Sequence, residues 1–157
     1  MKKETLLIRM AITFLGVVVL MLSVFFLPWL TKTGTDAFPD PLIFAIVGGM
    51  VLTLPPFFFA LFQALVLLKQ IDTQEAFTQA SKSAIKKIKN AAFMITGIYM
   101  LLLPVFYIIA ELDDAPGVVV IGILLAGAPL VIAVFAAVLE KLLESTLAIK
   151  SENDLTI

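Results

Sequence analysis

Four long stretches of apolar residues, none interrupted by a charged side chain, dominate this sequence of 157 residues. They cover residues 10–30, 42–68, 91–110 and 117–139. About 20 apolar residues in a helix, each rising about 1.5 Å, cross a hydrocarbon core about 30 Å thick. Because open strands would leave backbone polar groups unpaired in lipid, we expect helices. The sequence therefore predicts an all-α polytopic integral membrane protein, a four-transmembrane-helix bundle that forms a single domain in the lipid bilayer.

The composition agrees with bilayer burial and excludes several classes of function. Hydrophobic residues make up 61% of the chain and charged residues 15%, against about 45–50% and about 25% in soluble domains. Neither cysteine nor histidine occurs, which excludes disulfides, thiol nucleophiles and the usual zinc sites. The sequence also has no phosphate-binding loop, catalytic triad or metal-ligand spacing. We expect no enzyme, no metal, no cofactor and, at a net charge of −1, no direct binding of nucleic acid.

The first stretch also has the basic start of a signal peptide, since Lys2, Lys3 and Arg9 precede it. It is too long for a typical signal peptide, and no cleavage site of small residues follows it. We therefore interpret it as a retained helix. The second stretch is longer than one crossing and contains Pro55 and Pro56, which predict a kink or a local break.

Lysine and arginine residues set the orientation, because they accumulate on the cytoplasmic side. With the N-terminus inside, the outer loops contain Lys32 alone. The cytoplasmic segments contain Lys2, Lys3, Arg9, Lys69, Lys82, Lys86, Lys87, Lys89, Lys141 and Lys150. Three or five spans would each place a lysine-rich segment outside. The distribution therefore predicts a multi-pass protein of the cytoplasmic membrane with both termini in the cytoplasm.

The segment 69–90, between the second and third stretches, has a helical pattern. Asp72 and Glu75 fit a capping box that would begin a helix just after the second span. Phe77, Ala84 and Ile88 fall on one face of this helix, and no breaker separates it from the third span. We expect a cytoplasmic helical hairpin that extends the second and third spans.

The opposite face of this segment presents Lys82, Lys86 and Lys89. These lysines suit contact with anionic lipid or with a cytoplasmic partner. Alternatively, the hairpin is purely structural and its lysines only enforce the topology.

The short outer connection between the third and fourth stretches contains Glu111, Asp113 and Asp114. Three carboxylates in four positions favour an outer site for a hard cation or a cationic peptide. The alternative is a tight connection in which Asp114 caps the next helix and Pro116 lies in its first turn.

Polar groups at membrane depth are few, and none of them is ionisable at neutral pH. Gln63 is the least expected; Thr13, Thr53 and Thr96 are the others available to line a polar route. The pairs Ala60–Ala64 and Ala133–Ala137 have the small-xxx-small spacing of close helix contacts. A coupled transporter normally keeps an ionisable residue within its spans, so the sequence disfavours one.

Five segments together resemble a family of small bacterial four-helix membrane proteins, the domain of unknown function 2975 family. These segments are 57–65 (FFFALFQAL), 68–72 (LKQID), 109–117 (IAELDDAPG), 131–139 (VIAVFAAVL) and 149–157 (IKSENDLTI). The resemblance covers essentially the whole chain. It implies no established activity, but members are often encoded beside a small helix-turn-helix regulator of the repressor type. By association, the resemblance implies a cytoplasmic DNA-binding protein as a partner.

The C-terminal segment 140–157 would be a cytoplasmic tail. Its residues Glu152, Asn153, Asp154 and Leu155 are candidate partner contacts, and the alternation of Leu155 and Ile157 suits a strand or a groove on a partner. A frayed terminus is the alternative.

The sequence favours a non-enzymatic bacterial sensor or regulatory component that binds such a regulator in the cytoplasm. One alternative is immunity-type protection against membrane-active cationic peptides. The other is a small transporter or channel formed by a homo-oligomer.

Overall fold

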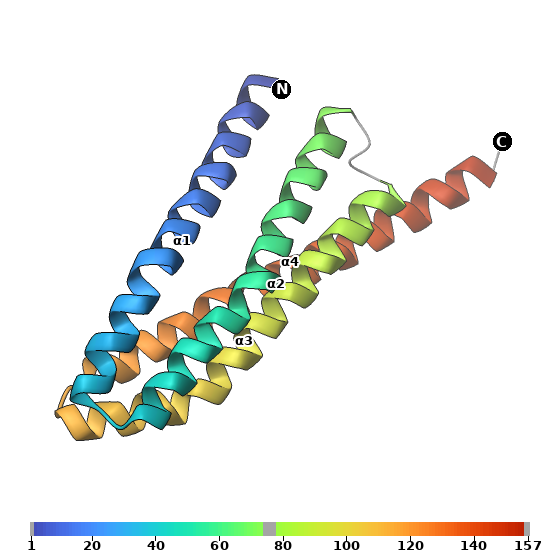
Figure 1. Ribbon diagram of the computed structural model, residues 1–157. Coiled ribbons are helices and arrows are strands. Elements are labelled where there is room, and N and C mark those ends of the chain that lie inside the picture. The colour runs from blue at the N-terminus through green and yellow to red at the C-terminus, as the bar shows by residue number, and fades with distance from the viewer. Residues whose placement is uncertain (1, 74–77, 156–157) are drawn as a thin grey trace.

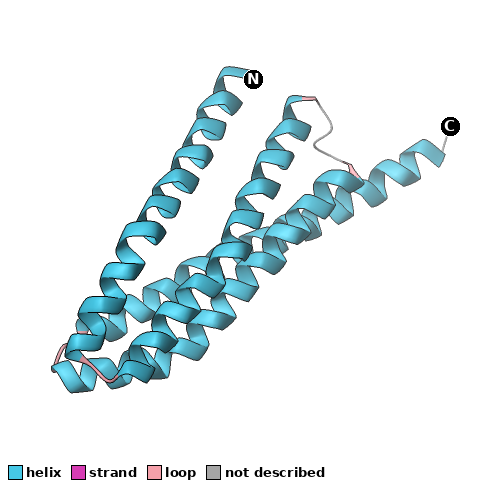
Figure 2. Ribbon diagram, viewed as in Figure 1, coloured by secondary structure: helices cyan, strands magenta, loops and turns pink. Residues whose placement is uncertain are grey.

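The computed structural model describes residues 2–73 and 78–155, and this part of the chain forms four long helices (Figures 1 and 2). They are α1 (Lys2–Ala37), α2 (Asp40–Asp72), α3 (Gln79–Asp113) and α4 (Gly117–Leu155). Each apolar stretch lies within one helix, and each helix is long and apolar enough to cross a membrane. The prediction of an all-α protein with four helices of membrane-spanning length is confirmed.

The ends of the helices lie at two opposite ends of the molecule (Figure 1). The terminal end carries the start of α1, the end of α2, the start of α3 and the end of α4. The turn end carries the two short connections, between α1 and α2 and between α3 and α4. Consecutive helices therefore run in opposite directions, as four successive crossings require.

The backbones of the helices approach closely only between neighbours in sequence. Among the described residues, the Cα atoms of α1 come within 8 Å of those of α2 but not of those of α3 or α4, and α4 approaches α3 alone. The backbones of the four helices therefore form an open, sequential array. The most extensive approach is between α3 and α4. The larger buried core cluster lies mainly between α2 and α3, where it includes Ile46, Tyr99 and Leu102.

The start of α3 differs from the predicted capping box. Thr78 is the N-cap, and its hydroxyl oxygen accepts a hydrogen bond from the backbone N–H of Ser81 at 3.3 Å. Asp72 is instead the last residue of α2, and Glu75 lies outside the described residues. Asp72 does not cap α3 because α3 begins only at Gln79; the Asp72 carboxylate bonds instead to α1, as described below. From Thr78 onward, α3 does continue into the third span without a break.

The connection between α3 and α4 also differs from the expected cap. Asp114 adopts the left-handed conformation with φ 50°, and its backbone N–H bonds to the carbonyl of Ala110. It therefore closes α3 as its C-cap instead of capping α4, a role that aspartate tolerates better than most residues. Pro116 precedes α4, which begins at Gly117.

Two further features of local structure bear on the expectations from the sequence. Pro55 and Pro56 predicted a kink or a local break, and α2 remains one helix through both prolines, so the local break does not occur. The described part of the C-terminal segment is neither a strand nor frayed, since α4 remains helical to Leu155. Thr156 and Ile157 lie outside the described residues.

Candidate functional site

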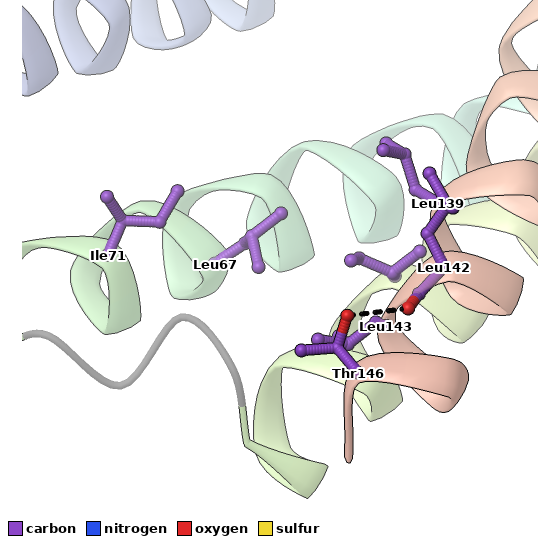
Figure 3. A pocket seen from close by; sticks show the side chains of 7 residues that line it. Leu67, Ile71, Leu139, Leu142, Leu143 and Thr146 are labelled. Atoms are coloured by element: carbon purple, nitrogen blue, oxygen red, sulfur yellow. Dashed lines mark hydrogen bonds between the residues drawn. The ribbon is translucent and has the colours of Figure 1, made fainter. Parts of the chain in front are cut away.

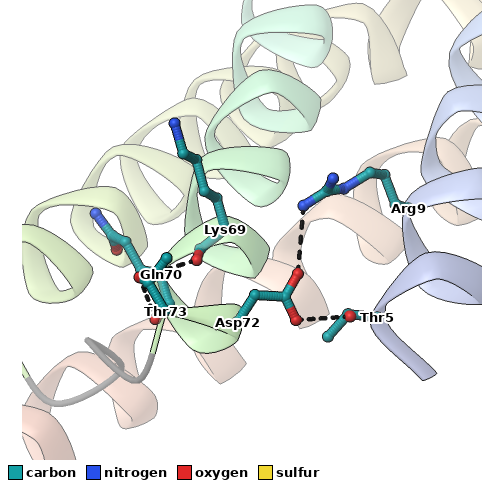
Figure 4. Close-up of polar contacts among 6 residues, drawn as sticks. All are labelled: Thr5, Arg9, Lys69, Gln70, Asp72 and Thr73. Carbon is teal, nitrogen blue, oxygen red and sulfur yellow. Dashed lines mark hydrogen bonds and ion pairs between the residues drawn. The ribbon is translucent and has the colours of Figure 1, made fainter. Parts of the chain in front are cut away.

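A polar cluster joins α1 to α2 at the terminal end (Figure 4). The hydroxyl of Thr5 donates to Asp72 Oδ1 at 2.7 Å, and Arg9 Nη2 lies 3.5 Å from Asp72 Oδ2. Beside it, the Thr73 hydroxyl donates to the carbonyls of Lys69 and Gln70 at the end of α2. This cluster anchors the first turns of α1, and sequence reasoning missed it because its members are more than 60 residues apart in the chain.

An ion pair joins α3 to α4. Lys89 Nζ donates to Glu140 Oε2 at 2.6 Å, and the two side chains are 22% and 15% exposed. Glu140 is the first residue after the fourth apolar stretch. The hydrogen bond from Lys89 holds the pKa of Glu140 below its ordinary value of 4.5, and the charges of Lys86 and Lys82 lower this pKa further. Of the three predicted contact lysines, Lys89 is therefore engaged within the chain, Lys82 is half-buried and Lys86 is exposed.

A pocket of about 280 Å³, the terminal pocket, lies between α2, α3 and α4 (Figure 3). Thr146 is the one polar residue among those that line the pocket, and its hydroxyl donates to the carbonyl of Leu142. Lys69 of α2, Lys89 of α3 and Glu140 of α4 are the charged residues nearest to the apolar stretches at the terminal end. Most of the lining residues lie between these charged residues and the terminal end of their helices. The residues that line the pocket are Leu67, Ile71, Ile85, Leu139, Leu142, Leu143 and Thr146.

The final turns of α4 project beyond this pocket. Glu152, Asn153 and Leu155 are exposed there, and Leu155 and Ile149 have 84% and 67% of their surface accessible. The side chain of Asp154 lies outside the described part of the chain. The predicted contact residues of the tail thus form the end of a helix.

A second hollow, the core cavity, has a volume of about 660 Å³ and lies between all four helices. Ala60 and Ala64 form part of its wall, so this small-xxx-small pair faces the cavity. By contrast, Ala133 is fully buried. The lining residues are Leu15, Val19, Leu22, Ser23, Phe26 and Leu27 of α1, Met50, Thr53, Leu54, Phe57, Ala60, Leu61 and Ala64 of α2, Ile88, Ala92, Ile95 and Tyr99 of α3, and Leu124, Leu125, Ala128, Pro129 and Ile132 of α4.

Three intramembrane polar residues line this cavity, Ser23, Thr53 and Tyr99, but most of those predicted for a polar route do not. Gln63 is buried on α2 but does not line it, and of the three threonines proposed for a polar route only Thr53 does. The Thr53 hydroxyl donates to the carbonyl of Met50 at 2.6 Å and lies 3.4 Å from the Tyr99 hydroxyl. No observation therefore favours the transporter alternative.

The predicted outer carboxylates lie together at the turn end. Glu111 and Asp113 belong to the last turn of α3, Asp114 caps it, and all three are exposed. Within the described ranges, no set of three acidic, histidine or cysteine side chains is arranged to hold a metal ion. The arrangement suits a diffuse negative surface better than a cation site.

Comparison with known proteins identifies the family. The family described as "Protein of unknown function (DUF2975)" matches residues 27–157. The chain belongs to this family. This DUF2975 protein is also 42% identical, over 99% of both chains, to a protein of Bacillus subtilis (strain 168) named "Uncharacterized membrane protein YoaS". No solved structure matches it. The family description and the relative's name support a membrane protein and state no activity, so a functional conclusion rests on the geometry.

Proposed function

We propose that this DUF2975 protein is a non-enzymatic regulatory component of the bacterial membrane that binds a cytoplasmic partner at the terminal pocket. The observation that carries the proposal is an apolar pocket beyond the charged residues that end the apolar stretches. Ten of the eleven lysine and arginine residues belong to segments at the terminal end, which supports a cytoplasmic location for it.

Exposed apolar surface on the water side of this boundary supports an interaction site. Leu142 is 60% exposed and Ile149 67% exposed, one helical heptad apart on the same face of α4. Residues 140–155 extend the helix by about 24 Å past the fourth apolar stretch, and Ile149 lies about 15 Å past it, beyond the hydrocarbon of the bilayer. Apolar patches in water typically mark contacts with another protein.

The geometry suits an amphipathic helix as the bound element. Such a helix would place its apolar side chains against Leu142 and in the terminal pocket, and exposed charges such as Lys86 and Lys141 would lie at the edge. A helix-turn-helix repressor, the partner that the family resemblance implies, consists of such helices. Because α3 and α4 continue without a break into their spans, binding here would act directly on the membrane part.

Co-purification from the native membrane tests this proposal. The tagged protein should recover a helix-turn-helix regulator, and the double variant Leu142→Asp/Ile149→Asp should lose it. The matched control, Ser145→Asp/Ser151→Asp, adds the same charge to exposed polar positions of α4 and should retain the regulator. Recovery of no DNA-binding protein, with the tail intact or truncated after Lys150, contradicts the proposal, and so does equal recovery by both double variants.

The exposed outer carboxylates support a second candidate function, protection against membrane-active cationic peptides. The side chains of Glu111, Asp113 and Asp114 make no hydrogen bond or ion pair with other described residues, so their charge is available. Deletion of the gene should then sensitise cells to a cationic peptide, and Glu111→Gln/Asp113→Asn/Asp114→Asn should mimic the deletion. Unchanged peptide tolerance of the deletion strain eliminates this function.

A further inference from the structure

We propose that the core cavity binds an acyl chain of a phospholipid from the surrounding bilayer, which enters between α1 and α4. The proposal rests on the depth of the cavity, the chemistry of its wall and the open side of the helix array. It is independent of the proposed cytoplasmic partner.

The cavity lies at the depth of lipid tails. The residues that line it fall within 15–27 of α1, 50–64 of α2, 88–99 of α3 and 124–132 of α4. Nearly all of them lie inside the apolar stretches. Its volume of about 660 Å³ falls within the range of about 300–1,000 Å³ that is typical of ligand sites. An apolar cavity of this size does not hold ordered water, and leaving it empty would forfeit packing contacts. A ligand that fills it must therefore be apolar.

The wall offers no charged partner to a ligand, and its polar side chains are hydroxyls engaged within the protein, with that of Tyr99 lying 3.4 Å from that of Thr53. No charged residue lines the cavity. The Ser23 hydroxyl donates to the carbonyl of Val19 at 2.7 Å, and the Thr53 hydroxyl donates to that of Met50. A free carboxylate or a phosphate inside would remain unpaired at high cost. A phospholipid avoids this cost because only its tail enters and its headgroup stays at the membrane surface.

The open array provides a lateral route for the tail. In the described ranges α1 approaches α2 alone, so no backbone contact closes the side between α1 and α4. In the most apolar 18 residues of α1, only 6% are buried inside the protein, whereas 39% are buried in the corresponding part of α3. The hydrocarbon of the bilayer therefore reaches the cavity directly, without passing through water. Small side chains at Ala60, Ala64 and Ala128 leave the space that the chain would occupy.

Photocrosslinking tests the site. The full chain is reconstituted in phosphatidylcholine nanodiscs that contain a phosphatidylcholine with a diazirine at the middle of one acyl chain, and labelled peptides are mapped by mass spectrometry. Ala92 and Ile95 are buried yet line the cavity, so a lipid in the annular shell does not reach them. We expect label on these residues as well as on the lipid-facing Leu101, which is 80% exposed.

A filled cavity provides the decisive comparison. In Ala60→Phe/Ala64→Phe, label at Ala92 and Ile95 should fall to background while label at Leu101 persists. The control Leu52→Phe, on an exposed face of α2 outside the cavity wall, should leave both labels unchanged. The milder variant Ala64→Leu, which should reduce the cavity label in part, covers the case in which the double variant does not fold.

Three outcomes overturn the proposal. Label confined to lipid-facing residues such as Leu101 would show that α1 closes the cavity. Equal cavity label in the wild type and in a folded Ala60→Phe/Ala64→Phe variant would place the lipid elsewhere. Crosslinks from a photoreactive residue at Ala128 to a second copy of the chain, in place of lipid, would show that another protein helix fills the space.

Discussion

Lys89 of α3 and Glu140 of α4 form an ion pair, with Nζ 2.6 Å from Oε2, at the level where both helices leave their apolar stretches. Lys89 lies two residues before the third stretch, and Glu140 follows the fourth one directly. The pair therefore joins the two helical extensions, residues 79–90 and 140–155, where they begin. Ile85 and Leu143, which line the terminal pocket, lie one turn beyond this junction.

Removal of one member of this pair should weaken the fold. Glu140→Gln keeps the shape and removes the charge, and we expect it to lower the free energy of unfolding by about 1 kcal/mol, near the upper end for ion pairs with some exposure. Denaturation in detergent micelles measures the loss. The double variant Lys89→Gln/Glu140→Gln should lose less free energy of unfolding than the sum of the losses in the two single variants, because the partners contact each other. Additive losses would show that the pair contributes nothing; the exposed Lys141→Gln serves as the control.

The same pair predicts how stability depends on pH. The folded pKa of Glu140 lies below its ordinary value of 4.5, so the stabilisation is complete above that value and is lost as the pH falls through the lowered pKa. Stability measured from neutral pH down to acid should therefore fall less in Glu140→Gln than in the wild type. A parallel fall in both proteins would assign the acid sensitivity to other carboxyl groups.

The anchor of α1 at the terminal end predicts local rather than global loosening. Asp72 of α2 bonds to Thr5 and Arg9 of α1 (Figure 4). The backbone of α1 approaches that of α2 and of no other described helix. Because the Arg9 side chain is 45% exposed, its ion pair contributes at most about 1 kcal/mol. Asp72→Ala should thus leave the unfolding midpoint almost unchanged but increase the mobility of a spin label at Leu7. Glu4→Ala, on the exposed face of the same turn, should not change that mobility.

Much of the fold follows from run lengths, because an uncharged stretch of about 20 residues has few alternatives to a membrane helix. The ends of the helices were harder to predict. Asp72 and Asp114 both have the chemistry of N-caps, yet one bonds to α1 and the other closes α3 in the left-handed region. Local sequence shows that a cap residue is present but does not show which helix or distant side chain it serves.

The sites were less predictable for a related reason. A small-xxx-small pair such as Ala60–Ala64 indicates that something approaches closely, and only the arrangement of four helices shows that a cavity lies there. Likewise, nothing in the sequence around Lys89 indicates Glu140, which is 51 residues away. The predicted carboxylates at the turn end do lie close together, because they share one helix end.

Adjacent glycines in α2 provide a matched pair for the contact between α2 and α3. A Cβ atom on Gly49 would collide with Leu102 Cδ1, whereas one on Gly48 would meet nothing within 4 Å. Because Leu102 is buried and has little room to move, Gly49→Ala should destabilise the protein by about 1–3 kcal/mol. Gly48→Ala should stay within about 0.5 kcal/mol of the wild type. Leu102→Ala should restore part of the loss in Gly49→Ala; equal stability of the two glycine variants would contradict this packing.

The orientation in the membrane is open to a direct test, because the chain has no cysteine and single cysteines report without background. Lys86→Cys lies on the lysine-rich segment of α3, and Leu112→Cys lies beside the outer carboxylates, and both positions are exposed. Since ten of eleven basic residues belong to segments at the terminal end, an impermeant maleimide on intact cells should label Leu112→Cys only. Lys86→Cys should react once the membrane is permeabilised. The reverse pattern would put the terminal pocket outside the cell, where no cytoplasmic regulator can reach it, and would leave the acyl-chain site in the core cavity untouched.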